Sequence, residues 1–161
     1  MRGLGVLLLL SPTFAAAQRF REAQEAGAPR AGRVEAFIEA NSLIDQNVVG
    51  ALNANAAFLE GMQSAGGPAL GAFMPEGEIR QEVWRQEPEI REGTTSWVTA
   101  FVSLAYAPLP EADFDAYIAF SESPEGQALN AALFSAFDAV FAATSRETGA
   151  ALAGLLTSED L

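Results

Sequence analysis

The Ser-Pro-x-Gly sequence formed by Ser123, Pro124 and Gly126 has residue types that could do chemistry. A serine nucleophile needs a base, and the chain has no His and no Lys, so a carboxylate such as Glu122 or Glu125 would have to serve. Capping needs no such assumption, because serine is a preferred N-cap and proline is favoured at the first helical position. Glycine at the fourth position, Gly126, would let the preceding helix approach closely. We therefore predict a structural corner between two helices, not a catalytic site.

A second group of polar residues interrupts an apolar helical pattern and consists of Asn41, Asp45, Asn47 and Asn55. These side chains could line a small polar pocket for a ligand. The structural alternative is that Asn41 ends one helix and that the Asn55 amide makes hydrogen bonds across the core, since buried amides must be satisfied. The pattern favours the structural alternative, and the polar pocket stays open as a candidate site.

Carboxylates are the third group, because acidic side chains can do acid–base work or bind a hard cation. The glutamates in residues 76–92 alternate with arginine and lack the dense spacing of a calcium-binding loop. This pattern is typical of a solvated helix face. The chain also has no Cys, which excludes disulfides, thiol nucleophiles and thiolate metal sites. We predict no catalytic residue, no metal site and no cofactor.

The formal net charge of −12 limits the classes of partner. It comes from 21 acidic and 9 basic residues, and every basic residue is arginine. An acidic surface repels phosphate groups, so we expect neither nucleic acid nor an anionic lipid surface as a partner. With 161 residues, half of them apolar, the chain is long enough to build one helical core.

Residues 1–17 have the three-part layout of a secretory signal peptide. Arg2 supplies an early positive charge, residues 4–10 form an apolar run, and residues 15–17 are all alanine, which suits cleavage after Ala17. The apolar run is too short to span a bilayer, which needs about 20 residues. We predict export to the periplasm by a cleavable signal peptide and no stable membrane anchor. The alternative is that residues 1–30 are the remnant of a longer relative.

Helical spacing dominates the remaining chain, and no strand-type alternation of useful length occurs. We predict an N-terminal helix or linker over residues 18–32 and a single all-α bundle over residues 33–161. Its five or six helices are expected to be mostly antiparallel neighbours, with breaks at residues 40–42, 66–75, 88, 107–110 and 123. The segment from Trp97 to Leu104 should be the buried central helix. The last helix should pack along it through Leu129, Leu133, Phe137 and Val140.

Three stretches together resemble a known family: ANSLIDQNVVGALNAN (residues 40–55), SWVTAFVSLAYAPLPEADFDAYIAF (residues 96–120) and SESPEGQALNAALFSAFDAVF (residues 121–141). They are similar to the exported, helical proteobacterial proteins grouped as domain of unknown function 2059, whose signature is an aromatic-rich helix followed by Ser-Pro-x-Gly. Phe120 and the Ser123–Gly126 corner are the most specific elements, while Ser121 departs from a second aromatic that members often have. The resemblance implies a periplasmic helical protein with no assigned activity.

These observations favour a non-enzymatic periplasmic interaction or binding module, whose partner is a protein or small ligand of the cell envelope. One alternative is a carboxylate-based hydrolase or metal-binding protein that uses the glutamate-rich segment or the asparagine cluster. Another is a structural subunit of a homo-oligomer, in which the apolar C-terminal helix packs against a copy of itself.

Overall fold

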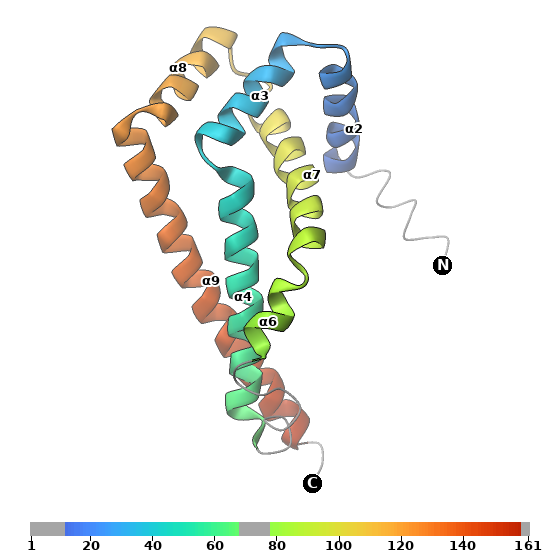
Figure 1. Ribbon diagram of the computed structural model, residues 1–161, viewed down its shortest axis with the longest axis vertical. Helices are drawn as coiled ribbons and strands as arrows, with labels where there is room; N and C mark the ends of the chain where they lie inside the picture. The colour runs from blue at the N-terminus through green and yellow to red at the C-terminus, as the bar shows by residue number, and fades with distance from the viewer. Residues whose placement is uncertain (1–11, 68–77, 159–161) are drawn as a thin grey trace, which may run out of the picture. The chain divides into compact units, whose positions relative to one another are not determined.

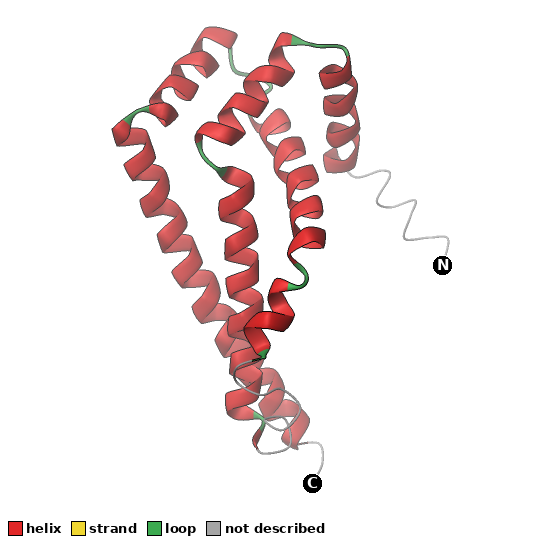
Figure 2. Ribbon diagram, in the orientation of Figure 1, coloured by secondary structure: helices red, strands yellow, loops and turns green. Residues whose placement is uncertain are grey.

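The computed structural model describes residues 12–67 and 78–158, and every regular element in these residues is a helix (Figure 1, Figure 2). The helices are α2 (Pro12–Glu25), α3 (Pro29–Ala40), α4 (Leu43–Ala65), α6 (Ile79–Trp84), α7 (Glu87–Ala105), α8 (Glu111–Glu122) and α9 (Pro124–Ser158). The predicted all-α class is confirmed, and the seven helices of this described part exceed the predicted five or six. One of the seven, α2, begins inside the predicted signal peptide (residues 1–17) and continues into residues 18–32, which were expected to be a helix or a linker.

The chain forms two compact units. Unit 1 is made from Met1–Asp45 and Glu92–Ala131, and unit 2 from Gln46–Arg91 and Ala132–Leu161. The predicted single bundle over residues 33–161 therefore divides into two bodies. Its expected start at residue 33 also falls inside α3, which begins at Pro29 because proline suits the first turn of a helix.

Prolines set most of the predicted helix boundaries. The predicted break at Pro88 is confirmed, since α6 ends at Trp84 and α7 begins at Glu87, which places Pro88 in the first turn of α7. Pro110 precedes α8, and Pro124 is the first residue of α9. Between α3 and α4 the chain turns at Asn41 and Ser42, and Ser42 adopts a positive φ of 49°. Of the predicted loop over residues 66–75, only Gly66 and Gly67 are among the described residues.

The core of unit 1 is built around α3 and α8, which run parallel to each other (Figure 1). Phe37 of α3 packs against Phe114 of α8, with ring centroids 5.6 Å apart, and Phe114 is fully buried. Helix α7 contributes Val98 and Val102 to the same cluster. Burying such side chains contributes roughly 1.5–3 kcal/mol each. Unit 1 therefore has a conventional apolar core.

Helix α7 contacts this core through a different face from the one predicted. Val98, Ala100 and Val102 are buried, whereas Trp97 and Phe101 are half exposed, at 50% and 53%. Leu104 is exposed as well. The prediction that Trp97 to Leu104 form a buried central helix is therefore wrong. Val98 and Val102 contact the main core, whereas Ala100 lies on another side of α7, against Ala16 and Ala17 of α2.

The alanines of the predicted cleavage site lie in α2. Ala16 and Ala17 are buried and form a small cluster with Ala100 of α7. Phe20, one turn later, joins the main core of unit 1. The residues on both sides of Ala17 therefore belong to a packed helix, while residues 1–11 lie outside the described part.

Unit 2 contains a parallel pair formed by the described unit 2 residues of α4 and α9 (Figure 1). The two backbones meet at glycines: a Cβ atom on Gly61 would overlap the Arg146 carbonyl oxygen, and one on Gly149 would overlap the Phe58 carbonyl oxygen. Side chains larger than hydrogen do not fit at these two positions. The pair is therefore held at short range by small residues.

Candidate functional site

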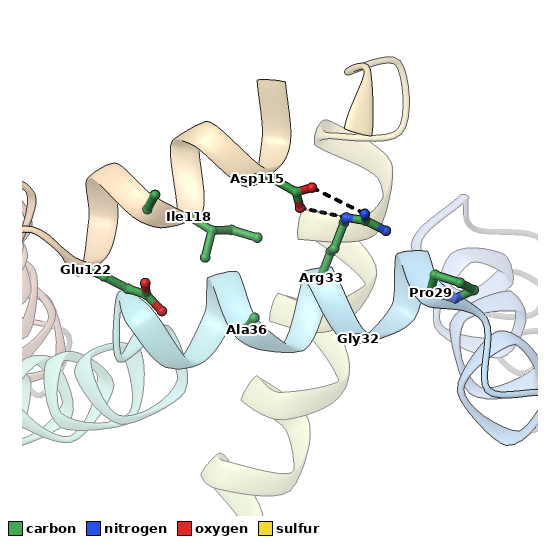
Figure 3. Close-up of a pocket in the computed structure, with 8 residues that line it drawn as sticks. Pro29, Gly32, Arg33, Ala36, Asp115, Ile118 and Glu122 are labelled. Atoms are coloured by element: carbon green, nitrogen blue, oxygen red, sulfur yellow. Dashed lines mark hydrogen bonds and ion pairs between the residues drawn. The ribbon is translucent and has the colours of Figure 1, made fainter. Parts of the chain in front are cut away.

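A groove between α3 and α8 is the candidate small-ligand site in unit 1 (Figure 3). It is a shallow groove of about 440 Å³ that is largely open to solvent. Its lining residues are Pro29, Gly32, Arg33, Ala36, Asp115, Ile118, Ala119 and Glu122. No local sequence pattern indicates this groove, since its two walls come from segments far apart along the chain.

An ion-pair network crosses the groove. Arg33 Nε donates to Asp115 Oδ1 at 2.6 Å, and a second guanidinium nitrogen donates to Asp115 Oδ2 at 3.2 Å. The third nitrogen lies 2.9 Å from Glu111 Oε2. The hydrogen bond from Arg33 lowers the pKa of Asp115 below its ordinary value, so the pair stays charged at neutral pH. Each of the three guanidinium nitrogens therefore already contacts a carboxylate of α8, which balances the charge of Arg33 within unit 1.

An aromatic cluster lies beside this network. Tyr106 stacks on Phe114 with ring centroids 5.2 Å apart, and the Arg30 guanidinium lies 4.7 Å from the centre of the Phe114 ring. Arg30 also donates a hydrogen bond to the Tyr106 carbonyl oxygen, next to the C-terminus of α7. Burial, followed by the neighbouring Tyr117, raises the pKa of Tyr106 to about 12. The Tyr106 hydroxyl is therefore neutral at physiological pH and cannot serve as a base.

The Ser-Pro-x-Gly corner has a structural role. Ser123 Oγ accepts a hydrogen bond from the Gly126 amide at 3.1 Å and donates one to the Phe120 carbonyl at 2.6 Å. Both bonds occupy the hydroxyl with backbone groups, which is the behaviour of an N-cap. A Cβ atom on Gly126 would overlap the Phe120 carbonyl oxygen, so glycine is required for the close approach. Ser123 therefore caps α9 and Gly126 allows the close approach of α8, which are the structural roles predicted for them.

Two amides that the sequence analysis did not single out connect this corner to the end of α3. Gln127 Nε2 donates to the carbonyl oxygens of Ala40 and Ser121, both at 2.6 Å. Asn130 Nδ2 donates to the Asn41 carbonyl at 2.8 Å. These bonds satisfy carbonyl groups that helix ends leave without intrahelical partners. The two corners of unit 1 are thereby fixed to each other.

The four residues of the predicted polar pocket are divided between the units. Asn41 is buried, ends α3 and donates to the Phe37 carbonyl at 2.9 Å, which is the role that the structural alternative gives it. Asp45, also in unit 1, is exposed. In unit 2, Asn47 is partly buried and Asn55 is exposed, so the prediction that Asn55 bonds across the core is wrong. Asn53, two residues earlier, makes the contact with α9 instead, with Nδ2 donating to Asp138 at 3.1 Å.

Carboxylates do not gather in the part of the chain that the structure describes. Within residues 12–67 and 78–158, no three acidic side chains lie close enough together to hold a metal ion. Arg91 bonds to Glu87 at 2.5 Å and Arg85 to Glu82 at 2.9 Å, both within a single helical turn. The glutamates of these pairs therefore take part in local ion pairs.

The residues that sequence reasoning assigned to the core of α9 lie on its surface. Leu129, Leu133, Phe137 and Val140 were expected to pack inward, yet each is about half exposed. The buried positions of α9 are Gly126, Gly149 and Ala153, and Asp138 lies on the α4 side through its bond to Asn53. The predicted packing face is therefore wrong. Small residues at four-residue spacing, Ser145, Gly149 and Ala153, are the sequence signal that could have identified the true contact face.

We call the exposed apolar residues of α9 in unit 2 the α9 stripe. Its members are Leu133, Phe137, Val140, Phe141, Leu152, Leu155 and Leu156, with exposed fractions from 39% to 63%. They form two groups, residues 133–141 and residues 152–156, on one broad side of the helix, and Thr144 and Thr148 lie between the groups on the same side. Phe137 and Phe141 stack on each other with ring centroids 6.2 Å apart. By length and composition, the helix over Pro124–Thr157 could also cross a membrane.

No family model, curated protein sequence or solved structure matches this chain. The resemblance to the exported proteins of domain of unknown function 2059 therefore stays a prediction. Function has to be argued from the surfaces and side chains of the molecule itself.

Proposed function

We propose that this protein is a non-enzymatic interaction module, and that the α9 stripe is its docking surface. The observation that supports this most directly is the exposure of seven large apolar side chains on one helix, with Phe137 at 55% and Leu155 at 63%. A contiguous apolar surface of several hundred Å² is typical of sites that bind another macromolecule. Large apolar residues scattered singly would need no such explanation.

Covering the α9 stripe would supply a substantial apolar contribution to binding. Fully burying a Leu, Val or Phe side chain contributes roughly 1.5–3 kcal/mol, so covering seven that are already half buried contributes on the order of 5–10 kcal/mol. The rigid-body freedom lost on association costs about 4–15 kcal/mol, which is of the same order. Two opposing terms of similar size suit a reversible complex better than a permanent one.

A non-enzymatic role agrees with the chemistry of the described residues. Ser123 is held by backbone groups, Arg33 is bonded to two carboxylates, and Tyr106 is neutral. A metal-dependent hydrolase is the alternative from another class. If it were correct, titration with calcium or magnesium would raise the melting temperature, because a ligand that binds only the folded chain stabilises it. We expect no shift with either ion.

Export to the periplasm is part of the proposal, and residues 1–17 supply the argument for it through their charged, apolar and small-residue segments. N-terminal sequencing of the protein recovered from the periplasmic fraction tests this point. The expected first residue is Gln18. A chain that keeps Met1 and stays in the cytoplasm would contradict export, and it would agree with the packing of Ala16 and Ala17 against Ala100.

Site-specific photo-crosslinking in living cells tests the docking surface. A photoreactive amino acid is placed at Phe137, in the α9 stripe, or at Ala139, which is exposed on another side of the same helix. We expect a discrete crosslinked product from position 137 and none from position 139. Equal labelling from both positions, or none from either, would rule out the α9 stripe as a docking surface.

A further inference from the structure

We propose that the partner of the α9 stripe is a second copy of this chain. In this arrangement the two α9 helices pack antiparallel around a twofold axis near Ala142 and Ala143. The proposal rests on the docking role proposed above and adds the identity of the partner.

The order of side chains along the α9 stripe is self-complementary about this axis. An antiparallel pair places Leu133 opposite the partner's Leu152, Phe137 opposite the partner's Thr148 and Phe141 opposite the partner's Thr144. Each large aromatic side chain thus faces a smaller one, so the two surfaces can interdigitate. A twofold axis repeats every contact, which is the arrangement of most homodimers.

Thr148 is suited to burial in such a contact although it is polar. Its hydroxyl donates to the Thr144 carbonyl of the same helix at 2.7 Å, so it needs no water partner. The methyl group of the side chain is then available for packing. The aromatic ring of Phe137 in the other copy can cover Thr148 without leaving a donor unsatisfied.

The α9 stripe contains no charged residue, and two of the charges on α9 are directed to α4. Asp138 accepts from Asn53, and Arg146 Nη2 lies 2.9 Å from Glu60 Oε2. When the α9 stripes of two chains pack together, no charged side chains meet at the centre of the contact. The net charge of −12 still makes two chains repel at long range, and salt screens that repulsion within about 8 Å at physiological ionic strength.

The area of the α9 stripe matches that of a standard interface. Its seven side chains each expose roughly 100 Å², which gives on the order of 700 Å² per chain, against about 800 Å² per partner in a typical stable complex. The patch is too extended for a small ligand, since it spans residues 133–156 of one helix.

An apolar helix could instead insert into a membrane, but the charged residues of α9 disfavour this. Asp138, Arg146 and Glu147 all fall within the 34 residues of Pro124–Thr157 that are long enough to span a bilayer. Each charge placed near the bilayer centre costs about 2.5–3.5 kcal/mol even on the most lenient scales. A second copy buries the same apolar side chains without burying these charges.

Analytical ultracentrifugation of the full chain tests the dimer. We expect a species of twice the 17.0 kDa chain mass at micromolar concentration, with a dissociation constant that falls as salt is added. Phe137→Glu should raise that constant by roughly 30-fold or more, as expected for a charge at the centre of an interface. Ala139→Glu, on another side of α9, should leave it unchanged, and circular dichroism checks that both variants remain helical. A wild-type chain that is monomeric at every concentration and salt would overturn the dimer.

Engineered cysteines test the antiparallel order, because the natural chain has none. Leu133→Cys and Leu152→Cys chains, mixed and mildly oxidised, should form the mixed disulfide in preference to either symmetric one. Preferential formation of a disulfide between two Leu133→Cys chains would overturn the antiparallel arrangement.

Two further outcomes separate this inference from the proposed function. A chain that stays monomeric at high concentration, yet gives a crosslinked product of another mass from position 137, would overturn the second copy and keep the docking surface. Flotation of the chain with neutral lipid vesicles, lost in Phe137→Glu and kept in Ala139→Glu, would overturn the second copy in favour of a membrane.

Discussion

The large apolar residues of α9 in unit 2 are placed differently from those that form the core of unit 1. In unit 1 the large side chains of α3, α7 and α8 meet inside, where Phe114 is fully buried and Phe37 contacts three other aromatic rings. Unit 2 also buries large side chains, which include Leu52 of α4 and Val83 of α6. Where α4 meets α9, however, the backbones approach at Gly61 and Gly149, and Asn53 bonds to Asp138. The large apolar residues of α9 lie outside that contact.

This difference shows where the free energy of apolar burial is already used and where it is still available. Each unit already buries some large apolar side chains within the chain, with Phe114 in unit 1 and Leu52 in unit 2 among them. The α9 stripe, in contrast, keeps its apolar area in water. A partner that covers the α9 stripe would add the burial of this area.

The largest expected effect comes from truncating an aromatic ring in unit 1. Phe114→Ala should lower the free energy of unfolding by about 3–5 kcal/mol, because it leaves a cavity at a fully buried site. Phe137→Ala, at an exposed site in unit 2, should change it by less than about 0.5 kcal/mol at concentrations where the chain is monomeric. Urea denaturation measures both values.

The two tryptophans separate the signals of the units, since Trp97 lies in unit 1 and Trp84 in unit 2. With Trp84→Phe as the background, fluorescence reports unit 1, and with Trp97→Phe it reports unit 2. A loss of several kcal/mol in Phe137→Ala under these conditions would show that the α9 stripe packs within the chain, and the contrast between the units would be withdrawn.

A smaller effect is expected from filling the close contact in unit 2. Gly149→Ala should lower the free energy of unfolding by about 1–3 kcal/mol, because its Cβ atom would overlap the Phe58 carbonyl and force the helices apart. The matched control is Gly154→Ala in the same helix, where a Cβ atom meets nothing within 4 Å. That control should raise the stability by about 0.5–1 kcal/mol, since alanine favours helix. Equal effects of the two substitutions would argue against close packing of α4 and α9.

The helices were predictable because local residue types mark their ends. Pro124 at a first turn and Ser123 at an N-cap each act within a few residues, so the corner and its hydrogen bonds could be foreseen. The side of each helix that packs against a neighbour could not be predicted, because it depends on which surface of another helix is complementary. Periodicity correctly grouped Leu133 and Phe137 on one side of α9, and the assumption that this side faces inward failed.

The groove between α3 and α8 shows a further limit of sequence reasoning. Arg33 and Asp115 are 82 positions apart, and nothing in their local sequences connects them. Only the parallel arrangement of the two helices brings the side chains together (Figure 3). The close contact at Gly149 was also hidden, because small residues contribute little to a hydrophobic pattern although they allow the nearest approach of two backbones.

Substitution of Tyr106, in unit 1, has the smallest expected effect on stability at neutral pH. Burial raises its pKa to about 12 from an ordinary value of 10.0, so the stability it contributes is fully present below pH 10 and is lost as the pH rises toward 12. Tyr106→Phe should therefore leave the urea midpoint nearly unchanged at about pH 8 and lessen the decline of the wild type above about pH 10. The chain contains no Lys and no Cys, so alkaline titration of side chains in this range comes from its two tyrosines. An equal alkaline decline in both proteins, followed by Trp97 fluorescence, would show that the Tyr106 hydroxyl is not buried in the core of unit 1.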